Sequence, residues 1–253
     1  MKGLIIKDMM CLRKQRVTFY YITICVTVLS VMFVLSAKFG NIAAATQSIR
    51  LENSVGEIDV KAISTTVLLL FMLLPIAIAG DVTSILSADG KAGFERVSTV
   101  LPLSVEKRVL AKYLSVFILT GMGVFVDVVL SFVLSVLTDL VSLREFLGMI
   151  LAAASIMVLY GALTILYYFL FGIGKENYAQ LAAIFSMGLG LLLLKYEDIK
   201  EVCMKGFLDS DKMTSFMHFI KYQSYWMLVI SVGIAFLSCG LAMYIAKRRR
   251  GII

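Results

Sequence analysis

The sequence predicts an all-α, polytopic membrane protein with six transmembrane helices and both ends in the cytoplasm, and three observations predict it. First, 60% of the 253 residues are hydrophobic and 16% are charged, whereas soluble domains are roughly half apolar and about a quarter charged. Second, the apolar residues form runs close to the ~20 residues that a helix needs to cross a bilayer. Third, basic residues lie beside the ends of those runs.

The apolar runs use nearly the whole chain, so we expect a single transmembrane domain over residues 1–253. The fifth span depends on one run, 181–194, which is apolar apart from Ser186. Without that span the C-terminus would lie on the other side of the membrane. The predicted spans are residues 17–37, 62–80, 113–137, 146–172, 178–194 and 225–246.

The orientation follows from lysine and arginine, which are retained on the cytoplasmic side of spans. With six spans, 15 of the 24 basic residues fall on the side of the two termini and nine on the other. Five of those nine lie in the loop after the fifth span, which also carries five acids. We therefore place both termini and the second loop in the cytoplasm, and the chain in a cell membrane as a multi-pass protein, with the bacterial cytoplasmic membrane expected.

Two segments outside the spans have helical apolar spacing. Residues 1–16 place Ile5, Met9 and Leu12 on one face among basic residues, which predicts an interfacial helix on the inner leaflet or a simple basic anchor. The predicted extracellular loop, 195–224, has the same spacing between residues 213 and 220 after acidic and serine capping residues. This pattern predicts an outer amphipathic helix, acting as an exit gate or as a plain interfacial lid.

The sequence lacks the residue patterns that several kinds of chemistry require. Neither Gly90-Lys91 nor Gly174-Lys175 completes a P-loop, because Ile85 and Phe169 stand where its first glycine belongs. The single histidine, His218, has no second ligand at zinc-binding spacing. The basic residues form no patch with interleaved aromatics. We expect no enzyme activity, no metal or cofactor bound by this chain, and no nucleic-acid partner.

Two polar signals lie inside the spans. Asp127 falls near the middle of the third span, where a charge is costly and usually faces protein or water. It is a candidate for a translocation path, or a neutral aspartate that packs two helices. Ala182, Ser186 and Gly190 form a row of small residues in the fifth span. Such rows let helix backbones approach closely, either within the chain or between two subunits.

The loop after the second span carries the most informative motifs. An acidic, glycine-containing stretch around Asp89 leads to the turn Leu101-Pro102-Leu103-Ser104, in which Ser104 can cap the next helix. A basic run from Lys107 then ends at Ala111-Lys112-Tyr113, and the chain opens with Met1-Lys2-Gly3-Leu4-Ile5-Ile6-Lys7-Asp8. These stretches resemble the ABC-2 type permease family in its short bacterial members, particularly the membrane subunits of phenol-soluble modulin and antimicrobial peptide exporters.

The resemblance implies a transmembrane permease subunit that forms the path for amphipathic or hydrophobic cargo, with peptide as the expected class. It implies that a cytoplasmic coupling segment, 88–104, docks on a separate P-loop ATPase, which alone binds ATP and Mg²⁺. It also implies a second permease subunit, identical or different, in the bilayer. The expected ATPase-coupling residues are Asp89, Phe94, Glu95, Arg96 and Leu101.

Two other functions stay open from the residues alone. Asp127 also suits a stand-alone secondary transporter driven by an ion gradient. A toxin-immunity membrane protein that acts without export would need none of the coupling residues.

Overall fold

The computed structural model describes residues 2–11, 13–38, 74–79, 81–91, 104–137, 143–172, 174–194 and 210–249. All regular elements in these ranges are helices, as the composition predicts. Three of the helices contain stretches long and apolar enough to cross a membrane, namely Val105–Val133, Phe146–Phe171 and Gln223–Arg249. A fourth helix contains a shorter apolar stretch, Val17–Met32. The helices are α1 (Lys2–Cys11), α2 (Arg13–Lys38), α5 (Leu74–Ala79), α6 (Thr83–Lys91), α8 (Val105–Leu137), α9 (Leu143–Phe171), α10 (Glu176–Leu194) and α12 (Ser210–Arg249).

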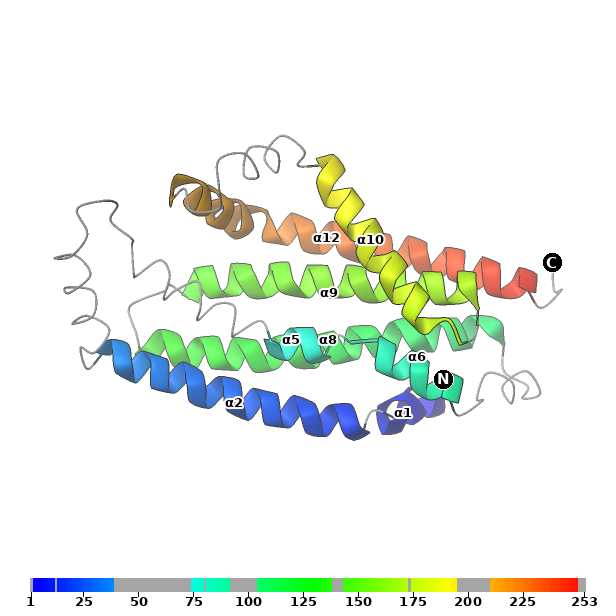
Figure 1. Cartoon of the computed structure of the whole chain (residues 1–253), viewed down its shortest axis with the longest axis horizontal. Coiled ribbons are helices and arrows are strands. Elements are labelled where there is room, and N and C mark those ends of the chain that lie inside the picture. The colour runs from blue at the N-terminus through cyan, green and yellow to red at the C-terminus, as the bar shows by residue number, and fades with distance from the viewer. Residues whose placement is uncertain are drawn as a thin grey trace.

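The long helices lie side by side and alternate in direction along the chain (Figure 1). Helices α2 and α8 run one way, whereas α6, α9 and α12 run the other. As a result α1, the end of α6, the start of α8 and the end of α12 meet at one end of the bundle, which we call the inner end. This arrangement agrees with two termini on one side, and the assignment of the inner end to the cytoplasm stays a prediction from the basic residues.

The core of the bundle lies between α8, α9 and α12. Gly161 lets α9 approach α8 closely, because a Cβ there would lie 2.7 Å from Val116 Cγ1. A polar contact joins all three helices: the Tyr113 hydroxyl lies 2.6 Å from Ser238 Oγ, and both hydroxyls donate to the Ala162 carbonyl. This contact satisfies buried hydroxyl groups, which would otherwise carry a desolvation cost.

The second predicted span, 62–80, is described only at its end. Helix α5 stops at Ala79, and the chain starts a new helix, α6, two residues after Asp81. Asp81 caps α6, since its Oδ1 accepts the Thr83 N–H at 3.1 Å. The first residues of the predicted coupling segment, 88–91, are therefore the last turn of α6 and not part of a loop.

The sixth predicted span, 225–246, agrees with the apolar stretch Gln223–Arg249, but the helix that carries it begins earlier. Helix α12 starts at Ser210, one of the predicted capping residues, and continues to Arg249 without a break. The predicted outer amphipathic helix is thus the first part of α12 and not a separate element within 195–224. A continuous backbone is possible because no proline or paired glycines interrupt residues 210–249.

The N-terminal helix packs on the protein through polar side chains. Asp8 is buried and Lys7 and Leu4 are half-buried, whereas Ile6 and Met10 are exposed. Of the predicted apolar face of Ile5, Met9 and Leu12, Ile5 is half-buried, and the other two side chains lie outside the described residues. A helix that buries charge against protein requires partners for that charge.

The topology is testable with an impermeant thiol reagent in intact cells. In a variant whose four native cysteines are replaced by serine, Lys2→Cys and Arg250→Cys should stay unlabelled, because the basic residues place both ends in the cytoplasm. Lys205→Cys should be labelled, and all three should react after permeabilisation. Labelling at position 250 together with protection at position 205 would remove the fifth span.

Candidate functional site

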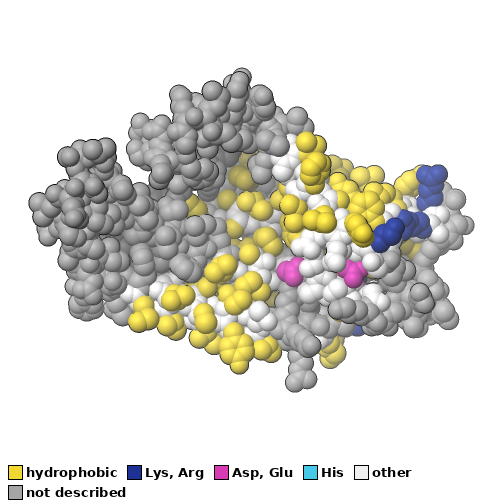
Figure 2. Space-filling model, in the orientation of Figure 1, with side chains coloured by type: hydrophobic (Ala, Val, Ile, Leu, Met, Phe, Trp, Pro, Cys, Tyr) yellow, Lys and Arg dark blue, Asp and Glu magenta, His cyan; other side chains and the backbone are white. Residues whose placement is uncertain are grey.

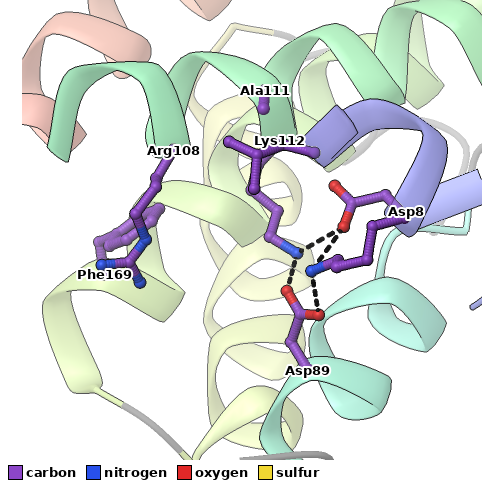
Figure 3. Close-up of a pocket in the computed structure, with 8 residues that line it drawn as sticks. Asp8, Asp89, Arg108, Ala111, Lys112 and Phe169 are labelled. Atoms are coloured by element: carbon purple, nitrogen blue, oxygen red, sulfur yellow. Dashed lines mark hydrogen bonds and ion pairs between the residues drawn. The ribbon is translucent and has the colours of Figure 1, made fainter. Parts of the chain in front are cut away.

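Four charged side chains from three helices meet at the inner end, and Figure 3 shows Asp8, Asp89 and Lys112 pointing toward one another. Lys7 Nζ of α1 lies 2.6 Å from Asp89 Oδ1 of α6 and 3.0 Å from Asp8 Oδ1. Lys112 Nζ of α8 pairs with Asp89 Oδ2 and lies 3.4 Å from Asp8 Oδ1. Ser115, one turn further along α8, donates to Asp8 Oδ2 at 3.3 Å. We call Lys7, Asp8, Asp89 and Lys112 the ionic cluster.

Capping residues set the position of two members of the cluster. Because Asp81 starts α6, Asp89 falls in the last turns of that helix. Ser104 starts α8, as predicted, since its Oγ accepts the Lys107 N–H at 3.4 Å. Lys112 follows two turns later, on the side of α8 that meets α1 and α6.

The ionic cluster is largely removed from solvent and balanced in charge. The side chains of Asp8 and Asp89 are 2% and 3% exposed, and Lys112 is 10% exposed. Burial alone would lower the pKa of Lys7, but hydrogen bonds and charge attraction from Asp89 and Asp8 raise that pKa above its ordinary value. Lys7 therefore stays charged at neutral pH, and each charge of the cluster depends on the two opposite charges beside it.

A small pocket lies beside the cluster. One wall is charged, with Lys7, Asp8, Asp89 and Lys112, and the rest comes from α1, α8 and α9. The Arg108 side chain extends toward Phe169 of α9 across this space (Figure 3). The inner ends of α1, α6, α8 and α9 thus share one junction. The remaining lining residues are Leu4 and Ala111.

The end of α12 is tied to the same junction. Lys247 Nζ lies 2.5 Å from Glu106 Oε1 at the start of α8, and the Arg249 guanidinium donates to the Leu170 carbonyl near the end of α9. Gly172, with φ +98°, makes room for that guanidinium, because a Cβ there would lie 2.8 Å from Arg249 Nη1. In Figure 2 basic side chains gather at this end, and apolar side chains cover much of the described surface beyond it.

Of the five predicted coupling residues, one lies among the described residues and four do not. Asp89 is buried in the ionic cluster, where its carboxylate is occupied by two amines. A direct contact between Asp89 and an ATPase stays a prediction. Phe94, Glu95, Arg96 and Leu101 lie outside the described residues.

Asp127 lies far from the ionic cluster, deep in α8. Its side chain is fully buried and lies against the backbone of Ile76 in α5. Gly123, one turn earlier on the same face, contacts α5 directly: a Cβ on Gly123 would lie 2.9 Å from Ile76 Cα. Asp127 therefore sits beside the α5–α8 contact.

The small residues of α10 divide into two faces. Ala179 and Ala183 are fully buried and belong to the side that packs in the chain. Ala182, Ser186 and Gly190 are half-buried, and a Cβ on Gly190 would have no described heavy atom within 4 Å. Contact of this row with a second subunit stays a prediction.

Sequence reasoning missed Lys7, Asp8 and Lys112 as site residues. The signal was present in the motifs, because Lys7-Asp8 closes the opening motif and Lys112-Tyr113 closes the motif of the third span. The sequence gives no distance between these motifs. Only the packing of α1, α6 and α8 shows that the two motifs and Asp89 form one cluster.

Comparison with known proteins identifies a family. The family model described as ABC-2 family transporter protein matches residues 57–248, about three quarters of the chain. No curated protein matches the chain. No solved structure matches it either.

Proposed function

The chain belongs to the ABC-2 family of transporter proteins, and from this membership we propose that it is the permease subunit of an exporter driven by a separate P-loop ATPase. The ATPase binds ATP and Mg²⁺, and this chain supplies the membrane path. We propose amphipathic or hydrophobic cargo, with peptide as the leading class, and the bacterial cytoplasmic membrane as its location.

One observation carries the proposal: the two helices on either side of residues 92–103 are bound to each other. Asp89 lies in the last turn of the helix before these residues, and Lys112 lies near the start of the helix after them. Their buried ion pair, together with Lys7 and Asp8, joins α6, α8 and α1 at the inner end. A force applied to the loop by an ATPase is therefore passed to three helices together.

The mechanism follows from this linkage. ATP binding and hydrolysis change the contacts that the ATPase makes with the loop, and a shift of the permease can be no larger than those differential contacts. The ionic cluster keeps α6 and α8 from separating under that load, so the loop acts on the spans as a lever. The half-buried row Ala182, Ser186 and Gly190 supports a dimer with a second permease subunit through α10.

The first test is purification of the tagged chain from its own membranes, followed by mass spectrometry and an ATPase assay. We expect a P-loop ATPase in stoichiometric complex, with hydrolysis faster in the complex than in the isolated ATPase. An ATPase that never co-purifies, in detergent or in nanodiscs, would overturn the proposal.

The double variant Glu95→Ala with Arg96→Ala tests the loop itself. Opposite charges at a polar docking surface contribute about 2 to 5 kcal/mol when a charge-assisted partner is lost, so we expect normal expression with at least about tenfold weaker ATPase binding. Arg144→Ala with Glu145→Ala makes the same change in charge at the start of α9 and should leave binding intact. Unchanged assembly and export in the loop variant would remove Glu95 and Arg96 from the docking surface.

A further inference from the structure

One face of α12 carries exposed apolar side chains and ends in an arginine. The stretch of α12 that includes this face is long and apolar enough to cross a membrane. Apolar side chains that a spanning helix exposes contact lipid, and tyrosine and arginine at the end of such a face lie at the level of the lipid headgroups. The exposed residues follow one another at i, i+4, i+7 and i+11: Leu237, Leu241, Tyr244 and Arg248.

The next residue, Arg249, is exposed but held in place at the end of α9. Its guanidinium donates to the Leu170 carbonyl, and a Cβ on Gly172 would lie 2.8 Å from Arg249 Nη1. One carbonyl occupies only a small part of the donors of a guanidinium group. Arg249 therefore presents further donors in a fixed orientation, and a planar fork of this kind suits bidentate binding of a phosphate group.

The charge around Arg249 is positive. Arg248 precedes it in the chain, and Lys175 lies three residues after Gly172 in the turn that leads to α10. Among the described residues, neither Arg248 nor Lys175 forms an ion pair. Cations grouped at the end of a membrane-spanning helix attract anionic headgroups.

Nearby acids do not cancel this charge. Glu106 pairs with Lys247 at the start of α8. The Glu176 carboxylate is directed to α6, since a Cβ on Gly90 would lie 4.0 Å from each of its oxygens. The ionic cluster is balanced by its own lysines. The guanidinium at the end of α9 is thus the group to which an approaching anion would bind.

We propose that the inner ends of α9 and α12 bind the phosphate of an anionic phospholipid, with Arg249 as the positioned ligand. Arg248 and Lys175 add attraction for the negative charge, and the acyl chains lie along the exposed face of α12. A lipid is favoured over an acidic protein surface, because basic and apolar side chains lie next to each other at this end (Figure 2). The site requires only that the chain lies in a membrane, so it does not depend on the export function.

The experiment uses the complete chain in detergent and measures lipid binding by native mass spectrometry. The probes are phosphatidylglycerol and phosphatidylcholine with the same acyl chains. We expect phosphatidylglycerol to bind about tenfold more tightly, and Arg249→Gln to weaken its binding by about tenfold, as the loss of a charge-assisted contact predicts. Arg144→Gln removes one positive charge from the opposite end of α9 and should bind both lipids as the wild type does.

Two glycine variants test the position of Arg249 without a change in charge. Gly172 and Gly174 have φ of +98° and +80°, so alanine strains the backbone at both positions. Only at position 172 does the added Cβ meet the Arg249 guanidinium, because a Cβ on Gly174 has no described heavy atom within 4 Å. Gly172→Ala should therefore weaken the binding of phosphatidylglycerol, whereas Gly174→Ala should leave it unchanged.

Three results would overturn the lipid site. The first is equal affinity for the two lipids in the wild type, or unchanged affinity for phosphatidylglycerol in Arg249→Gln. The second is displacement of the lipid by excess inorganic phosphate, which would indicate a site for free anions. The third is loss of a co-purifying ATPase in Arg249→Gln with unchanged lipid binding, which would assign the arginine to a protein docking surface. Each of these results leaves the export function standing.

Discussion

Asp89→Ala is expected to lower the free energy of unfolding by about 3–5 kcal/mol, because it removes one member of a buried ion pair and leaves the Lys112 amine without its closest partner. The Asp89 side chain is 3% exposed and contacts amines from two other helices. Its loss should loosen α1 and α6 together. The measurement is the temperature at which the detergent-solubilised chain loses its monodisperse peak in size-exclusion chromatography.

Two further variants separate this effect from a general loss of charge. Asp89→Asn with Lys112→Gln removes one charge of each sign, and it should recover much of the lost stability because Lys7 and Asp8 remain balanced. Glu106→Gln changes an exposed pair with Lys247 and should leave the transition almost unmoved, since exposed pairs contribute little. If Asp89→Ala were as stable as Glu106→Gln, the ionic cluster would not hold the inner end together.

Gly123→Ala is expected to destabilise the chain by about 1–3 kcal/mol, although alanine is the better helix former, because overpacking a close contact costs more than the helical preference returns. The added Cβ would lie 2.9 Å from Ile76 Cα and 3.0 Å from Ala79 Cβ. The first contact is to backbone, so α5 itself must shift. The same chromatographic melting experiment measures the loss.

Gly121→Ala is the matched control, two residues away on the same helix. A Cβ there meets no described heavy atom within 4 Å, so this variant should be as stable as the wild type or slightly more stable. A larger loss for Gly121→Ala than for Gly123→Ala would contradict the direct contact between α5 and α8.

Composition and hydropathy predict the helical membrane class, and the structure has stretches long enough to cross a membrane at three of the six predicted spans. Apolar runs near the length of a bilayer leave few alternatives to a helix, because every backbone polar group in lipid must be paired internally. The cap at Ser104 was also predictable, since a serine after Leu101-Pro102-Leu103 supplies an acceptor where a helix starts. The family followed from short motifs whose residues lie close together in the chain.

Helix packing determines which charged residues act together. Lys7, Asp89 and Lys112 are separated by 82 and 23 positions along the chain, and local patterns carry no information about such distances. The same holds for Gly123 and Gly121, which differ only in whether a second helix lies against them. Local propensity and hydropathy determine where a helix forms, whereas packing determines which of its faces contacts protein. The ionic cluster and the burial of Asp127 depend on packing.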